Sequence, residues 1–341
     1  HTLLVLYGDV PLIRVATLQQ LIDRAAGGSL AVLTALLDEP QGYGRILRDA
    51  SGAVTGIVEQ KDASTEQLQI REINTGFLAA PAALLRAWLK QLDNSNAQGE
   101  YYLTDVIAMA ASEAVAIAAV QADDESEILG VNDRVQLAAL ERKLQARYAL
   151  DLMQGGVTLV DPARIDVRGK LEAGEDCFID ANVIIEGSVK IGDRVKIGPN
   201  CMIKNSVISE NVEILGHCVI EDAVIESGCR IGPFARIRPL RRLAEQVHVG
   251  NFVEIKKSDI ARGSKINHLS YIGDTRMGAS VNVGAGTITC NYDGANKHLT
   301  EIGDNVFIVS DTKLIEPVTF GDGATIGDGS TITREVPANE L

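Results

Sequence analysis

An apolar residue, most often isoleucine, recurs at every sixth position through most of the second half of the chain. The series runs from Ile179 to Val283 with four steps of five, and it resumes from Ile302 to Ile332. Neither a helix, which repeats every 3.6 residues, nor a strand, which alternates every two, requires this spacing. A parallel β-helix does, because each short strand with its turn takes one hexapeptide. Three hexapeptides close a triangular coil, so residues about 18 apart should stack on neighbouring coils, ~4.7–4.9 Å apart.

The composition limits what else the chain can be. Hydrophobic residues make up 46% of its 341 residues, which is enough for the cores of two domains. The net charge of -14 argues against a nucleic-acid partner and against binding to an anionic membrane. No apolar run is long enough to span a bilayer, so no membrane insertion is expected. The five cysteines include no CxxC pair, which favours reduced thiols and a cytoplasmic location.

Three parts are expected along the chain. Residues 1–132 alternate strand-like and helical stretches, which indicates an α/β domain with a Rossmann-like sheet. Residues 133–155 form one apolar-striped pattern that ends in two glycines, which predicts a linker helix. Residues 156–341 form the β-helix, interrupted after Thr289 by the polar stretch CNYDGANKHLTE, which predicts a loop projecting from the solenoid.

Two cations should meet on one wall of the solenoid. Arg238 and Lys256 each follow an inward isoleucine by one residue and are 18 apart, so they should stack. Stacked cations are unfavourable unless an anion lies between them. A carboxylate partner or simple solvation would explain the pair. A phosphate site is the sharper hypothesis, because arginine offers a bidentate fork and lysine a point charge.

His268 follows the inward Ile266 by two residues, close to a corner of the next coil. Spacing predicts that six polar residues share three or four successive coils of one wall: Arg238, Glu254, Lys256, His268, Tyr271 and Asn282. A neutral histidine is a suitable general base at physiological pH. Glu254 could fix its tautomer.

The segments GNFVEIKK (250–257), NHLSYIGD (267–274) and NVGAGTITCNYDGANKH (282–298) closely resemble the acetyltransferase half of the bacterial bifunctional GlmU enzymes. Those enzymes join a glucosamine-1-phosphate N-acetyltransferase to an N-acetylglucosamine-1-phosphate uridyltransferase. The first half is similar too, through YGDVPL (7–12), GYGRI (42–46), GIVEQKD (56–62), EINTG (72–76), NAQGEYYLTD (96–105) and GVNDR (130–134). The resemblance implies a partial Rossmann-like nucleotidyltransferase domain joined by a helix to a left-handed β-helix.

The resemblance also implies residue roles. His268 matches the catalytic base and Glu254 the residue that orients it. Glucosamine 1-phosphate would be bound by Arg238, Lys256, Tyr271, Asn282 and Lys297. Acetyl-CoA would be contacted by Ala285, Asn291, Tyr292 and Ser310. In the uridyltransferase half, Mg²⁺ would be held by Asp9 and Asn132, and the nucleotide sugar or UTP by Tyr7, Gly44, Glu59 and Asn74. The family is a cytoplasmic homotrimer with acetyl-transfer sites between subunits, and it supplies UDP-N-acetylglucosamine for cell-wall synthesis.

Departures from the family pattern lead to two expectations. The chain opens with His1 inside an apolar strand, without the family's glycine-rich phosphate loop. We therefore expect a fragment that lacks N-terminal residues and cannot make UDP-N-acetylglucosamine. Val309 replaces a usual glycine, Asp328 replaces a usual alanine, and the chain stops at Leu341 before a cofactor-binding arginine. These differences predict weaker acetyl-CoA binding.

Other readings of the β-helix remain open. It could be a regulatory module on a sugar-nucleotide pyrophosphorylase, or a non-catalytic trimeric scaffold. An enzyme of the carbonic anhydrase kind would need His217, His248 and His268 to converge on a metal, and their stacking registers differ.

Overall fold

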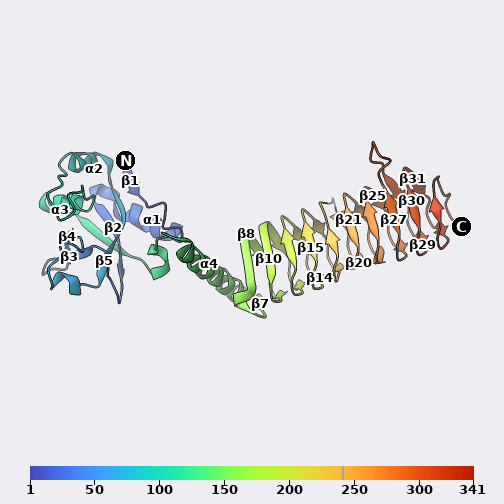
Figure 1. Ribbon diagram of the computed structural model, residues 1–341, viewed down its shortest axis with the longest axis horizontal. Coiled ribbons are helices and arrows are strands. Elements are labelled where there is room, and N and C mark those ends of the chain that lie inside the picture. The colour runs from blue at the N-terminus through green and yellow to red at the C-terminus, as the bar shows by residue number, and fades with distance from the viewer. Residues whose placement is uncertain (240–241) are drawn as a thin grey trace. The chain divides into compact units, whose positions relative to one another are not determined.

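The computed structural model describes residues 1–239 and 242–341, which form two compact units, residues 1–144 and 145–341 (Figure 1). Helix α4 (Arg134–Gln154) matches the helix expected at 133–155, and the division between the units falls inside it. Each unit has its own core.

The first unit is an α/β domain built on a six-stranded sheet of order β4-β3-β5-β2-β6, with β1 paired to β5. Its strands are β1 (Thr2–Val5), β2 (Leu30–Leu36), β3 (Arg45–Arg48), β4 (Val54–Val58), β5 (Glu72–Pro81) and β6 (Ile117–Gln121). Its helices are α1 (Val15–Arg24), α2 (Ala82–Leu89) and α3 (Asp105–Ser112), with short 3₁₀ turns η1 (Ala26–Gly28), η2 (Gln67–Gln69) and η3 (Glu125–Ile128). Among the described strands of this sheet only β2 and β6 pair in parallel, so the sheet is mixed.

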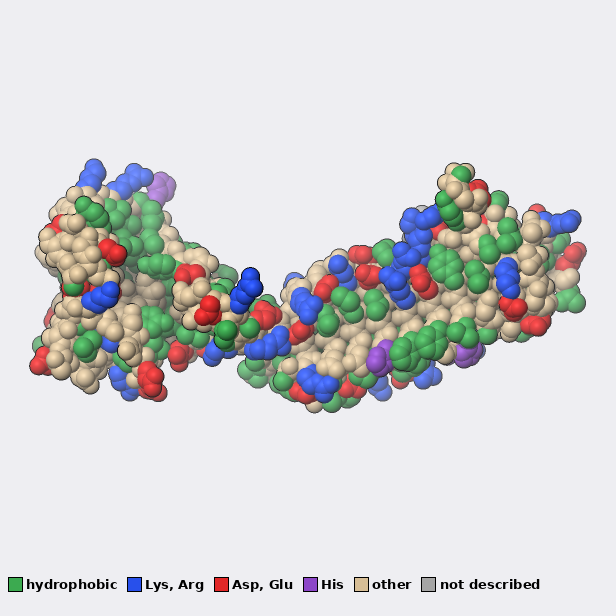
Figure 2. Space-filling view, in the orientation of Figure 1, with side chains coloured by type: hydrophobic (Ala, Val, Ile, Leu, Met, Phe, Trp, Pro, Cys, Tyr) green, Lys and Arg blue, Asp and Glu red, His purple; other side chains and the backbone are tan. Residues whose placement is uncertain are grey.

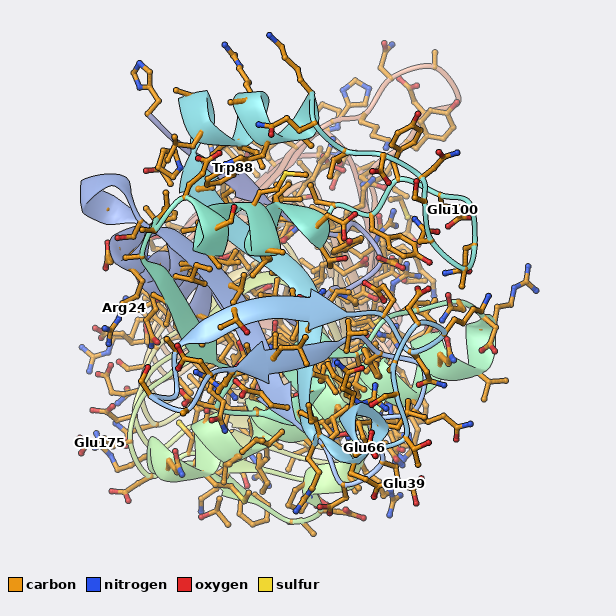
Figure 3. The ribbon with its side chains drawn as sticks, turned by 90° about the vertical axis from the view of Figure 1, so that its left-hand side faces the viewer. Arg24, Glu39, Glu66, Trp88, Glu100 and Glu175 are labelled. Carbon is orange, nitrogen blue, oxygen red and sulfur yellow. The ribbon has the colours of Figure 1, made fainter. Side chains whose placement is uncertain are left out.

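The central strand β2 is buried on both faces, which explains its continuous apolar sequence LAVLTAL. Leu33 faces a core that includes Leu21 of α1, whereas Val32 faces a second core with residues of α2 and α3. Trp88 lies between α2 and α3 (Figure 3), where its indole N–H donates to the Glu113 carboxylate at 3.1 Å. Helices therefore cover both faces of the sheet.

The second unit is a parallel β-helix with three walls (Figure 1). Two long strands, β8 (Ile165–Ala173) and β10 (Val183–Ile191), start it after the turn η4 (Pro162–Arg164). The first wall contains β12 (Met202–Lys204), β15 (Val219–Glu221), β18 (Arg236–Ile237), β21 (Glu254–Lys256), β24 (Tyr271–Gly273), β27 (Ile288–Cys290), β30 (Lys313–Ile315) and β33 (Thr331–Ile332). The second wall contains β13 (Val207–Ile208), β16 (Val224–Ile225), β19 (Arg242–Leu243), β22 (Asp259–Ile260), β25 (Thr275–Met277), β28 (Thr300–Ile302) and β31 (Val318–Phe320).

The third wall is a ten-stranded sheet. It contains β7 (Thr158–Leu159), β9 (Phe178–Ile179), β11 (Lys196–Ile197), β14 (Glu213–Ile214), β17 (Arg230–Ile231), β20 (His248–Asn251), β23 (Lys265–His268), β26 (Asn282–Val283), β29 (Phe307–Ile308) and β32 (Thr325–Ile326). The predicted solenoid is thus confirmed.

The hexad residues form the solenoid core as the spacing predicts. Ile237 pairs with Ile255, three full hexads later, and Ile255 pairs with Ile272 across a coil that contains one of the shorter steps. All three side chains are completely buried. Burying one such side chain stabilises the fold by roughly 1.5–3 kcal/mol, so the repeat both aligns and stabilises the coils. A loop projects between β27 and β28 (Figure 1), where the polar stretch predicts one.

Candidate active site

A basic cluster lies on the first wall of the solenoid. Arg238 follows β18 and Lys256 ends β21, and the pairing of Ile237 with Ile255 places the two cations on adjacent coils. Both have carboxylate partners: Arg238 donates to Glu254 at 3.0 Å, and the Lys256 Nζ lies 3.9 Å from Asp274. The stacking predicted from the spacing is therefore present, with a carboxylate beside each cation.

The projecting loop adds a third cation. Lys297 reaches Lys256, and this contact is the main cause that lowers the pKa of Lys256, followed by burial and partly opposed by Asp274. The Lys256 side chain is only 13% exposed, so water screens the repulsion poorly. A dianion between these groups would relieve the repulsion, which makes the cluster suited to a phosphate. Figure 2 shows Lys and Arg side chains gathered below the loop.

Asp274 is the anion that organises this cluster. Its carboxylate accepts a 2.6 Å hydrogen bond from Asn291 of the loop and lies near Lys256. The Asn291 amide also donates to the Tyr271 hydroxyl at 3.4 Å, so Asp274 and Asn291 together link Lys256 to Tyr271. Sequence reasoning did not single out Asp274, which follows Gly273, the register partner of Lys256 on the next coil.

His268 lies elsewhere than predicted. It ends β23 on the third wall, and Asn282 begins β26 on the same wall, so the prediction of a single wall is wrong for both. The corner falls after His268, because Leu269 takes a left-handed conformation with φ of 50°. The hexad spacing identifies the coil but does not fix which side of a corner a residue occupies.

The histidine ring also has a different neighbour. The Nδ1 atom of His268 lies 2.7 Å from the amide oxygen of Asn251, which pairs with it in register. Glu254 instead accepts from Arg238 on the first wall. Within one chain, Glu254 therefore belongs to the basic cluster and Asn251 contacts the imidazole.

The residues predicted to contact acetyl-CoA are divided between a corner and the loop. Ala285 and Ser310 follow β26 and β29 at the end of the third wall, where the carbonyl of Ala285 accepts from the N–H of Asp311 at 2.7 Å. Tyr292 is exposed in the loop, and its hydroxyl donates to the carbonyl of Gly294. Asp328 lies one coil after Ser310, because its neighbour Gly329 donates its N–H to the Ser310 carbonyl.

The α/β unit contains a second candidate site, a cavity of about 740 Å³. Its lining includes all six residues predicted for the uridyltransferase half: Tyr7, Asp9, Gly44, Glu59, Asn74 and Asn132. Thr104 donates to Glu59 at 3.0 Å, and Asn74 donates its N–H to the Gly44 carbonyl. Sequence reasoning missed Thr104 and also Gly76, whose φ of 84° and close approach to the Tyr7 ring exclude a larger residue.

The described residues offer few groups that could bind a metal ion. Within residues 1–239 and 242–341 no group of three or more His, Cys, Asp or Glu side chains could hold a metal ion. Asp9 and Asn132 both line the α/β cavity, and the N–H of Val131 donates to the Asp9 carbonyl at 2.8 Å. One carboxylate with one amide oxygen suits Mg²⁺ that takes its other ligands from water and phosphates.

Two relatives named bifunctional protein GlmU match the chain along all 341 residues. The protein of Methylococcus capsulatus is 59% identical, and the chain covers 74% of it. That of Alkalilimnicola ehrlichii is 56% identical, with 73% covered. The chain belongs to the GlmU family.

Two weaker likenesses accompany this match. Residues 167–251 match the family described as GMPPB C-terminal domain, inside the solenoid. The solved UDP-N-acetylglucosamine acyltransferase of Francisella novicida is 16% identical, covers 53% of this chain and 67% of its own, and has a TM-score of 0.30. The GlmU assignment depends on neither. Across the described residues, no helix is long and apolar enough to cross a membrane.

Proposed function

We propose that the solenoid of this GlmU chain transfers the acetyl group of acetyl-CoA to the amine of glucosamine 1-phosphate. The observation that carries this proposal is the meeting of Arg238, Lys256 and Lys297, which are suited to a sugar phosphate. A scaffold or regulatory module gives no reason to hold the partly buried Lys256 against a second lysine. Membership of the GlmU family supports the same function over these alternatives.

The chemistry requires a base. The substrate ammonium loses a proton to the Nε2 atom of His268, and the free amine attacks the thioester carbonyl. The C–S bond then breaks, the attacking nitrogen releases its second proton to water to leave a neutral amide, and the CoA thiolate takes the proton back from the imidazolium. By family analogy the backbone N–H of Ala285 donates to the oxyanion. Asn282 and Tyr271 would hold the sugar, and Asn291, Tyr292 and Ser310 the cofactor.

The division of the site between two walls supports a homotrimer. His268 is on the third wall and the basic cluster on the first, with a corner between them. If this corner faces a threefold axis, the third wall of each copy faces the first wall of the next. His268 of one copy would then meet Lys256 and Glu254 of another, where the Glu254 carboxylate would steady the imidazolium that forms.

The corner itself has the surface that such an axis needs. His217, Phe234 and Phe252 stack along it with ring centroids 4.7 and 5.2 Å apart, and the exposed Leu269 follows. Figure 2 shows this line of hydrophobic side chains along one edge of the solenoid. All four residues adopt positive φ, an uncommon conformation for bulky side chains. Burial between copies would explain an exposed row of this kind.

The α/β cavity would bind the nucleotide sugar of the family's second reaction. Tyr7, Gly44, Glu59 and Asn74 would contact UDP-N-acetylglucosamine or UTP. Asp9 and Asn132 would hold Mg²⁺, whose charge would neutralise the phosphates. Acetyl-CoA and UTP are cytoplasmic metabolites, and the five cysteines are free thiols, so we place the protein in the cytoplasm in the supply of cell-wall precursors.

One assay tests the proposed function. The protein is incubated with acetyl-CoA and glucosamine 1-phosphate, and the release of free thiol is followed. We expect thiol release that depends on both substrates, and none when N-acetylglucosamine 1-phosphate, which has no free amine, replaces the acceptor. The absence of thiol release at millimolar substrate would refute the proposal.

A further inference from the structure

The imidazole of His268 has one short hydrogen-bonding contact on its Nδ1 side. Asn251 ends β20, one coil before His268 ends β23, and the two residues are register partners. The distance from the amide oxygen of Asn251 to Nδ1 is 2.7 Å. Strands β20 and β23 are longer than the other strands of this wall, so their pairing continues to the corner and holds the two side chains side by side.

This contact determines where the ring proton lies. An amide oxygen only accepts hydrogen bonds, so Nδ1 must carry the hydrogen and Nε2 must carry the lone pair. We propose that Asn251 is a positioning residue that fixes His268 in the Nδ1–H tautomer and presents Nε2 as the base. The catalytic role of this tautomer rests on the proposed acetyl transfer. The tautomer itself can be measured without any reaction.

The charged residues near the ring in the same chain do not fix its tautomer. Glu254 of the same chain accepts from Arg238 at 3.0 Å on the first wall. The pKa of His248, on β20, is lowered mainly by burial and to a smaller extent by neighbouring groups that include His268. Lys265, three positions before His268 on β23, is exposed and also acts on His248. Lys265 has no acceptor atom, and among the described residues no hydrogen bond joins His248 to the His268 ring, whereas the Asn251 oxygen lies within hydrogen-bonding distance of Nδ1.

The first experiment measures the tautomer directly. The whole protein is labelled with ¹⁵N-histidine, and the ring nitrogen shifts of His268 are identified by their loss in His268→Gln. We expect Nδ1 to be protonated in the neutral ring, and Asn251→Ala to shift the ring toward the Nε2–H form that prevails in free histidine. A wild-type ring protonated at Nε2, which is the result if the amide presents its NH₂ group, would overturn the proposal.

The second experiment measures acetyl transfer. Asn251→Ala should lower kcat by about 10–100-fold, the usual cost of losing an orienting partner, with little change in the KM for glucosamine 1-phosphate. Asn251→Asp retains an acceptor, so it should keep the tautomer and much of the rate. Its carboxylate favours the imidazolium, so the acid limb of the pH–rate profile should move up by about one pH unit or more.

Lys265→Ala is the matched control, because it changes an outward residue on the same strand and should alter neither the tautomer nor kcat. If Asn251→Asp loses as much activity as Asn251→Ala with no change in the profile, the residue is merely structural and the proposal is wrong. If the wild-type protein has the Nδ1–H tautomer but no acetyl transfer, the proposed function fails while the assignment of Asn251 to the tautomer stands.

Discussion

The two units of this chain obtain their contacts in different ways. In the solenoid, a strand pairs with the strands one coil before and one coil after it, as Ile255 does with Ile237 and Ile272. In the α/β unit, by contrast, strands far apart in the sequence pair with each other, as Thr2 does with Pro81. A repeat therefore lets individual side-chain neighbours be derived from spacing, whereas the sheet yields its site only through motifs. The two units should also respond to mutation independently of each other.

The largest expected effect separates the two sites. His268→Ala should reduce acetyl transfer by about 10²–10⁴-fold, because the amine loses the general base that we propose for it. Binding of glucosamine 1-phosphate to the solenoid and of UDP-N-acetylglucosamine to the α/β cavity should be nearly unchanged, as measured by calorimetry. A normal rate in this variant would remove His268 from the mechanism.

The next prediction compares the two cores. Ile255→Ala should destabilise the solenoid by about 2–5 kcal/mol, since it leaves a cavity in a fully buried position. Ile46→Ala, which is 2% exposed, is the matched change in the α/β unit. The single tryptophan, Trp88, lies in the α/β unit, so its fluorescence reports that unit in a urea titration while circular dichroism follows the solenoid. If Ile255→Ala moves the tryptophan transition, the units are coupled and the comparison fails.

A pH effect should be confined to the solenoid. Glu316, 7% exposed, accepts from Thr300 and donates its N–H to the Cys290 carbonyl at the base of the loop. The pKa of Glu316 is raised from an ordinary 4.5 to about 7, mainly by burial and also by Asp274, against the lowering effects of Thr300 and His298. The folded state therefore binds a proton that the unfolded state releases, so stability present below pH 4.5 is lost as the pH rises through about 7.

Glu316→Gln keeps the shape of the side chain without its charge. At pH 8 this variant should be more stable than the wild type by up to about 3 kcal/mol, and near pH 4 the two should be similar. Urea titrations of the solenoid at both pH values measure the difference. Equal pH dependence in the two proteins would show that Glu316 does not titrate as described.

The smallest expected effect concerns the cofactor. Asp328→Ala removes a carboxylate next to Ser310, beside the expected position of the polyanionic acetyl-CoA. Affinity for acetyl-CoA should rise about 2–5-fold, the size of an exposed charge interaction. Calorimetric titration measures it, with Asp23→Ala on α1 of the α/β unit as the control that should change nothing. Unaltered affinity would place Asp328 away from the cofactor.

The sequence predicted the solenoid well because its contacts are local. The hexad identified the inward isoleucines and placed Arg238 next to Lys256, and the polar stretch identified the loop that carries Lys297. It misplaced His268, because counting hexads does not show how a left-handed residue such as Leu269 turns the corner. Asn251 was within reach of the same arithmetic, since it lies one coil before His268.

The α/β unit was less predictable in detail. Strand β5 pairs with β1, β2 and β3, and among the described strands of this sheet only β2 and β6 run in parallel. Alternating patterns in the sequence do not encode this arrangement. The α/β domain is therefore present as predicted, but its sheet is mixed. The six residues predicted for its site line one cavity, because motif resemblance carries long-range information that hydrophobic periodicity lacks.

The central claim is that acetyl transfer needs the third wall of one copy and the first wall of another. Co-expression of His268→Ala chains with Arg238→Ala/Lys256→Ala chains tests it most directly, because each variant alone lacks one half of every site. We predict that the mixed assemblies recover a substantial fraction of wild-type thiol release, through interfaces that unite an intact third wall with an intact first wall. Mixed assemblies no more active than the two variants assayed separately would contradict the account.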